Sequence, residues 1–189
     1  MNQEQVKKQP RPLQLETKEE RCAYYDAVAP ERERWRAKNQ GYHDEIARFY
    51  RSVIPEGSSV LQIGCGTGDL LAALQPSRGV GIDFSPEMIR IAQTRHPDHQ
   101  FIVADAEALS LDETFDFVIM ADVVGDLYDP WQAFRELHKV IRPDTRVVVT
   151  YYNMLWEPVL RAGEWAGLKM PQFYQNWLSS DDLANLLGL

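Results

Sequence analysis

Short apolar runs alternate with amphipathic stretches along most of the chain, and this pattern predicts strands that alternate with helices. Five apolar runs bounded by turn residues are expected as strands. Strands connected through helices at this spacing form right-handed βαβ units, so an α/β fold with a mostly parallel sheet and helices on both faces is expected. The expected strands cover residues 59–63, 80–83, 101–104, 115–120 and 147–151.

The intervening stretches carry the end signals of helices. Ser85, Pro86 and Glu87 are typical of a helix N-terminus, because proline suits the first turn and a carboxylate suits the positive end of the helix dipole. Near the end of the chain, the sequence Ser-Ser-Asp-Asp at 179–182 fits a capping box followed by a leucine stripe. Helices are therefore expected over residues 69–74, 86–95, 130–141 and 180–187.

The region before the first strand has a different character. Residues 1–16 are rich in glutamine and show no periodicity, which indicates a flexible tail. Residues 17–55 are expected to form an N-terminal helical lid of two helices, at about 18–28 and 39–54, stopped by Pro30 and Pro55. Residues 56–189 are then expected to form the sheet domain.

The composition is ordinary for one compact domain: 189 residues, of which 44% are hydrophobic and 25% charged. Such a chain needs no covalent cross-links, and the two cysteines, Cys22 and Cys65, are too few for a disulfide scaffold. No apolar run approaches the roughly 18 residues of a membrane span, and the N-terminus has no signal-peptide core. A cytoplasmic protein is expected.

Acidic residues outnumber basic residues by 28 to 20, which argues against a nucleic-acid partner held by positive charge. The excess is local, because residues 105–129 contain no lysine or arginine. Such a cluster is either a solvated surface or a rim that attracts a cationic ligand. Its eight carboxylates belong to Asp105, Glu107, Asp112, Glu113, Asp116, Asp122, Asp126 and Asp129.

A glycine-rich turn follows the first expected strand, with Gly64, Gly66 and Gly68. Glycines remove Cβ atoms where a ligand approaches the backbone, and ligands of doubly wound sheets bind at this carboxyl edge. Asp83 ends the second strand, where a carboxylate can accept hydrogen bonds from both hydroxyls of a ribose. An adenosine compound is therefore the expected ligand; the alternative is a plain strand–helix turn.

Two features distinguish among adenosine compounds. The glycine spacing differs from the dinucleotide fingerprint G-x-G-x-x-G, and an acidic rim does not suit a pyrophosphate. Asp105 follows the third strand, where it can accept a hydrogen bond from the exocyclic amine of adenine. Both features favour a ligand with a sulfonium and an ammonium over one with phosphates.

Five stretches, taken in order, resemble the successive motifs of class I S-adenosylmethionine-dependent methyltransferases, and most of all the small-molecule branch that includes the quinone-biosynthesis enzymes. The resemblance covers residues 20–153 and implies a Rossmann-like sheet of strand order 3-2-1-4-5 with S-adenosylmethionine as cofactor. Gln62 departs from the family, which usually has Glu or Asp there. The stretches are VLQIGCGTG at 60–68, VGIDFSPEM at 80–88, ADAE at 104–107, FDFVI at 115–119 and LHKVIRP at 137–143.

The resemblance also implies roles for individual residues. The glycine turn cradles the methionine and ribose, Asp83 binds the ribose hydroxyls, and Asp105 with Ala106 recognises the adenine edge. Tyr25 and Tyr42 come from helices that cover the cofactor in this family. The implied cofactor-binding residues are Gly64, Cys65, Gly66, Gly68, Asp83, Phe84, Met88, Asp105, Ala106, Glu107, Ala121, Tyr25 and Tyr42.

Residues expected to face the methyl acceptor follow the fourth and fifth strands: Asp122, Tyr128, Tyr151 and Tyr152. Zinc-ligand spacings and nucleophile motifs are absent from the sequence, so no metal is expected. Methyl transfer fits this absence, since the electrophile is the cofactor's own methyl group. No residue is assigned as a catalytic base.

The predicted function is methyl transfer from S-adenosylmethionine to a small-molecule acceptor, chiefly by positioning and desolvation. An NAD(P)-dependent oxidoreductase and a non-catalytic S-adenosylmethionine-binding module stay open as alternatives. The two strands that usually end this family's sheet are absent, so we expect a C-terminally truncated chain. The natural protein would then continue past residue 189, with room for a further domain, and the truncated chain would self-associate through the edge strand at 147–151. The alternative is that a partner chain or the 1–16 arm covers this edge.

Overall fold

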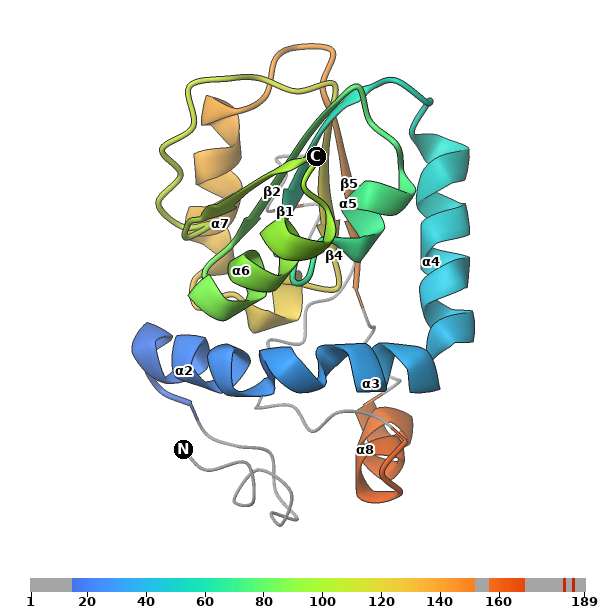
Figure 1. The fold of residues 1–189 in the computed structure, drawn as a ribbon. Coiled ribbons are helices and arrows are strands. Elements are labelled where there is room, and N and C mark those ends of the chain that lie inside the picture. The colour runs from blue at the N-terminus through green and yellow to red at the C-terminus, as the bar shows by residue number, and fades with distance from the viewer. Residues whose placement is uncertain (1–14, 152–156, 169–181, 183–184, 186–189) are drawn as a thin grey trace.

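A computed structural model describes residues 15–151, 157–168, 182 and 185. Within these residues, five parallel strands form one central sheet in the order β3-β2-β1-β4-β5 (Figure 1). This Rossmann-like order confirms the prediction. The strands are β1 (Ser59–Ile63), β2 (Arg78–Asp83), β3 (Gln100–Val103), β4 (Phe117–Ala121) and β5 (Arg146–Thr150).

Helices cover both faces of the sheet, because the strands are apolar on both sides. Helices α4 (Gln40–Val53), α5 (Asp69–Ala73) and α6 (Pro86–Arg95) contribute to one core together with Val60 and Ile119. Helix α7 (Pro130–Glu136) contributes to the other core, where its residues pack with side chains such as Leu61 and Val118 from the same two strands.

The N-terminal region contains one helix more than predicted. Helix α2 (Lys18–Val28) begins with a capping box between Thr17 and Glu20 and ends at the predicted residue. Pro30 then lies in a 3-10 turn, η1 (Ala29–Glu31), from which helix α3 (Arg32–Lys38) starts at once. The two-helix prediction was wrong here, because proline is tolerated in a first helical turn, where its missing N–H is not needed.

Helices α2 and α3 run end to end across one edge of the sheet (Figure 1). This is the edge at which the parallel strands have their carboxyl ends, since α2 contacts Phe84, Asp105 and Asp126, all of which follow strand ends. The helix pair therefore covers the place where a doubly wound sheet binds its ligand.

Smaller differences from the predicted elements are local. The expected helix at 130–141 changes to a 3-10 turn, η3 (Leu137–Lys139), in its second half. A short 3-10 turn, η2 (Val124–Asp126), and helix α8 (Glu157–Trp165) were not predicted. Residues 1–14 of the expected tail and Tyr152 lie outside the described residues. Of the expected helix at 180–187, residues 182 and 185 alone are described.

Two kinds of feature are absent from the described residues. Among them, no helix is long and apolar enough to cross a membrane. Nor do three or more His, Cys, Asp or Glu side chains in this part of the chain come together as a metal site.

Candidate functional site

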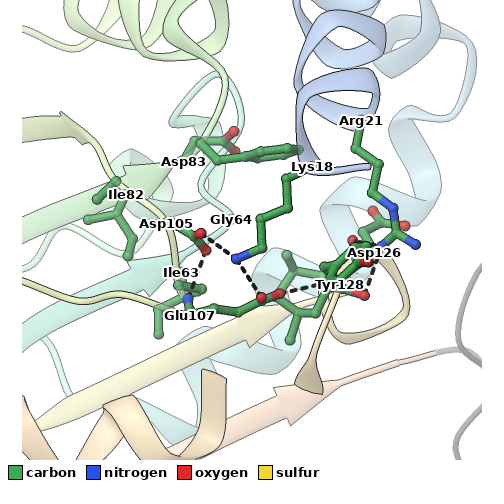
Figure 2. Close-up of a pocket in the computed structure, with 15 residues that line it drawn as sticks. Lys18, Arg21, Ile63, Gly64, Ile82, Asp83, Asp105, Glu107, Asp126 and Tyr128 are labelled. Atoms are coloured by element: carbon green, nitrogen blue, oxygen red, sulfur yellow. Dashed lines mark hydrogen bonds and ion pairs between the residues drawn. The ribbon is translucent and has the colours of Figure 1, made fainter. Parts of the chain in front are cut away.

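A pocket lies at the carboxyl ends of β1 to β4, below helix α2 (Figure 2). Each strand delivers its residues to the same edge, because the strands are parallel. Residues from α2 complete the pocket from the other side. The lining residues are Lys18, Arg21, Ile63, Gly64, Ile82, Asp83, Phe84, Ala104, Asp105, Ala106, Glu107, Val123, Asp126, Leu127 and Tyr128.

Asp83 is a buried carboxylate of the site, with 9% of the residue exposed. Its Oδ2 accepts from the backbone N–H of Gly66 at 2.8 Å, and its Oδ1 accepts from the N–H of Ser85 at 3.0 Å. Burial raises the pKa of Asp83, against the effect of these two N–H groups and of the Arg32 guanidinium. Asp83 thus joins the end of β2 to the turn after β1.

The three glycines of the turn all have positive φ but differ in their surroundings. A Cβ on Gly64 would lie 2.3 Å from Val123 Cγ2, and a Cβ on Gly68 would lie 2.6 Å from the Phe101 ring. Both glycines are therefore required by packing. The nearest atom to a Cβ on Gly66 would be the Arg32 guanidinium at 3.5 Å, so Gly66 alone of the three has room beside it.

Arg32 was missed by the sequence analysis. It is the first residue of α3, half-buried, and its guanidinium lies over the backbone of Gly66. Within the described ranges, no acceptor pairs with Arg32 in a hydrogen bond or an ion pair. A partly buried cation without an acceptor, next to a glycine turn, is suited to an anionic group of a ligand.

Asp105 and Glu107 share a partner that the sequence analysis also missed. The Nζ of Lys18 lies 2.6 Å from Asp105 Oδ2 and 2.6 Å from Glu107 Oε2. The other oxygen of Glu107 accepts from the backbone N–H groups of Tyr128 and Asp129, at 2.7 and 2.8 Å. Glu107 therefore holds the segment after β4 in addition to lining the pocket.

Two tyrosines from the N-terminal helices donate to carboxylates that follow β4. The Tyr25 hydroxyl donates to Asp126, and the Tyr42 hydroxyl donates to Asp122. The Tyr25 ring also meets the Phe84 ring edge to face, with centroids 5.6 Å apart, and burial raises the pKa of Tyr25 well above its usual value. Both tyrosines thus connect the helices to the carboxyl edge of the sheet.

Nine expected site residues that the structure describes do not line this pocket: Cys65, Gly66, Gly68, Met88, Ala121, Asp122, Tyr25, Tyr42 and Tyr151. Cys65 is buried and its thiol stays protonated, because burial raises its pKa well above the usual value. Met88 packs with Tyr24 and Tyr25 of α2. Ala121 packs against the core on one face of the sheet, and Tyr151 packs against the core on the other face. Tyr152 lies outside the described residues.

Most carboxylates of the acidic window at 105–129 have a partner within the molecule. Glu113 pairs with Arg78, Asp116 with Arg142, and Asp129 caps α7. Asp105 and Glu107 share Lys18, while Asp122 and Asp126 accept tyrosine hydroxyls. The sequence left two interpretations of this window open, a solvated surface or a rim that attracts a cationic ligand. Because most of these carboxylates already have partners, the structure gives the second interpretation little support.

Known proteins share this domain. A family model described as a methyltransferase domain matches residues 61–149, which contain the glycine turn, Asp83 and Asp105. Residues 61–149 belong to the methyltransferase domain family. The predicted resemblance to class I S-adenosylmethionine-dependent methyltransferases is confirmed for this part of the chain.

Individual relatives agree on the class and differ in the acceptors they are named for. The ubiquinone/menaquinone biosynthesis C-methyltransferase of Hahella chejuensis is 32% identical over 65% of this chain and 55% of its own length. The malonyl-[acyl-carrier protein] O-methyltransferase of Marinomonas is 28% identical over 75% of this chain and 58% of its own length. The chain thus spans little more than half of these relatives.

A solved structure shows the same fold. The S-adenosylmethionine-dependent methyltransferase of Thermotoga maritima, described as a possible histamine N-methyltransferase, superposes with a TM-score of 0.73 and 22% identity. The match covers 89% of this chain and 79% of that protein. At this identity the likeness establishes the architecture, including the order of the strands.

Proposed function

We propose that this chain transfers the methyl group of S-adenosylmethionine to a small-molecule acceptor. The observation that carries the proposal is the pocket where Asp83 and Asp105, at the ends of neighbouring strands, face residues of α2. A carboxylate after the second strand suits the hydroxyls of a ribose, and a carboxylate after the neighbouring strand can accept from an adenine amine. The membership of residues 61–149 in the methyltransferase domain family supports the same ligand.

Two further residues fit the amino-acid end of the cofactor. Arg32 carries a guanidinium that has no acceptor among the described residues, beside the glycine turn. Gln62 Oε1 is buried, and no donor in the described part of the chain reaches it. Buried acceptors of this kind normally have a donor. We assign Arg32 to the carboxylate and Gln62 to the ammonium of the cofactor.

When bound, S-adenosylmethionine supplies an electrophilic methyl group on a sulfonium. The chain's own residues then hold the cofactor and exclude water. Asp83 and the glycine turn hold the ribose side, and Asp105 holds the adenine. Helix α2 covers the pocket and keeps water out through its contacts with Asp126 and Leu127. Positioning and desolvation of this kind account for several kcal/mol of rate acceleration, roughly 7–11 kcal/mol at best.

A nicotinamide-dependent oxidoreductase is the second candidate, because it uses the same edge of the same kind of sheet. Thermal denaturation with S-adenosylhomocysteine or with NAD distinguishes the two, since only a ligand of the native state raises the midpoint. We expect a higher midpoint with S-adenosylhomocysteine and no change with NAD. The reverse result would overturn the proposal.

Catalysis is tested separately from binding. Methyl-labelled S-adenosylmethionine should yield a labelled product with one of two acceptors: a demethylated quinol, or a malonyl thioester, as the names of the relatives suggest. Binding of S-adenosylhomocysteine without transfer to any acceptor of a broad panel would favour a binding module. Location in the cytoplasm and self-association through β5 also stay proposals.

A further inference from the structure

The ammonium of Lys18 lies inside the cofactor pocket, although Lys18 belongs to α2 and not to the sheet. Figure 2 shows the side chain reaching from α2 toward Asp105 and Glu107, which follow β3. Both contacts are 2.6 Å long. These contacts raise the pKa of Lys18, although burial alone would lower it, so the ammonium is charged at neutral pH.

Each oxygen of the Asp105 carboxylate already accepts one hydrogen bond. Its Oδ1 accepts from the backbone N–H of Glu107 at 2.8 Å, and its Oδ2 accepts from Lys18. Under the proposed function, the exocyclic amine of adenine seeks an acceptor on the same side chain. The Lys18 ammonium lies in the pocket at 2.6 Å from Oδ2, so an amine that approaches this oxygen from the pocket competes with it for the same place.

We propose that Lys18 is a latch that closes α2 over the pocket and competes with the adenine amine for Asp105. The inference rests on the proposed function. On cofactor binding, the ammonium leaves Asp105 Oδ2 to the amine and stays with Glu107 Oε2. Helix α2 remains docked meanwhile, because Arg21 donates to the carbonyls of Asp126 and Leu127, and Asp26 accepts from Ser85 and from the Glu87 N–H.

The exposure of the three side chains explains why this exchange is easy. Lys18 and Asp105 are 39% and 37% exposed, so water stabilises each of them when their contact breaks, and such a pair is weak. The side chain of Glu107 is 5% exposed, so its charge needs the ammonium more. Lys18 therefore gives up Asp105 before Glu107.

The competition is tested by calorimetry with two ligands. S-adenosylhomocysteine carries the amine, whereas S-inosylhomocysteine carries a carbonyl in its place. Lys18→Met should bind S-adenosylhomocysteine about two- to fivefold tighter than the wild type, the strength of an exposed ion pair. The same variant should bind S-inosylhomocysteine equally or more weakly. Arg48→Met removes an exposed pair with Glu45 on α4 and should change neither affinity.

Hydrogen exchange of the free protein provides a second measurement, because it needs no ligand. The amides of α2 should exchange faster in Lys18→Met than in the wild type and in Arg48→Met. Unchanged exchange would overturn the latch. Weaker binding of S-adenosylhomocysteine by Lys18→Met, or the same gain for both ligands, would overturn the competition. If neither the wild type nor any variant binds S-adenosylhomocysteine, the proposed function is overturned instead. Hydrogen exchange then still tests whether Lys18 holds α2 over the pocket.

Discussion

The backbone N–H of Gly66 donates to Asp83 Oδ2 at 2.8 Å, and this bond joins the turn after β1 to the end of β2. The two residues lie 17 positions apart in the chain and meet at the edge where the pocket opens. One carboxylate thus shapes the glycine turn and faces the pocket. Changes at Asp83 therefore need a control that separates the two effects.

Asp83→Ala should weaken the binding of S-adenosylhomocysteine by roughly 2–4 kcal/mol, because a charged acceptor of two ribose hydroxyls is lost. Asp116→Ala is the matched control, since Asp116 also accepts from a backbone N–H, that of Ser59, but at the opposite ends of the strands. Calorimetry should show an unchanged affinity for this control. Equal affinity of Asp83→Ala and the wild type would remove Asp83 from the site.

Acid should weaken the fold in part through Asp116. The backbone N–H and the hydroxyl of Ser59, with the Arg142 guanidinium, lower its pKa below the ordinary value of 3.8. The unfolded chain therefore takes up the proton first as the pH falls, so the stabilisation is present above 3.8 and is lost through the lower, folded value. Urea midpoints of the wild type and Asp116→Ala should differ clearly at about pH 6 and converge toward about pH 2.

Gly66→Ala should abolish or strongly weaken cofactor binding in a folded protein. The added methyl group meets only the movable Arg32 guanidinium, although the positive φ of 53° costs about 1–2 kcal/mol of stability. Gly68→Ala, in contrast, places a carbon 2.6 Å from the Phe101 ring and should lower the melting temperature more. Circular dichroism and calorimetry check both variants. If folded Gly66→Ala binds S-adenosylhomocysteine with full affinity, Gly66 is needed for the conformation of the turn alone and not for cofactor binding.

Arg32→Met should weaken S-adenosylhomocysteine binding by about 1.5–3 kcal/mol, the range for a hydrogen bond to a charged group. The same variant should bind methylthioadenosine normally, because that ligand lacks the amino-acid end. Arg34→Met is the control, since Arg34 is exposed on the same helix and pairs with Glu31. Loss of affinity for both ligands would place Arg32 in the packing of α3 rather than at the carboxylate.

Gln62→Glu should tighten S-adenosylhomocysteine binding about fivefold, because a carboxylate binds an ammonium better than an amide does, by roughly 1 kcal/mol. The free variant should melt at a lower temperature, since the position is 3% exposed and the new charge is buried. Added S-adenosylhomocysteine should bring the melting temperature of the variant back to that of the wild type. A tighter complex with methylthioadenosine as well would contradict a contact with the ammonium.

The sequence by itself determined the strands, the glycine turn and the positions of Asp83 and Asp105. These features are local, because an apolar run between turn residues forms a strand and the next residue then lies at its carboxyl end. The parallel arrangement followed from the alternation of strands and helices, and the order of the strands from the family motifs. Helix ends marked by caps, such as Ser85 before α6, were equally predictable.

Only the tertiary structure decided which N-terminal residues enter the site. Lys18 contacts Asp105, which lies 87 positions away in the chain. Arg32 lies beside Gly66 and belongs to α3, a helix that was not predicted because Pro30 precedes it. The same docking gives four carboxylates of the acidic window a partner: Lys18 pairs with Asp105 and Glu107, and tyrosine hydroxyls donate to Asp122 and Asp126. The physical reason is that docking depends on side-chain contacts between distant segments, and no local periodicity records which lysine or arginine will meet which carboxylate.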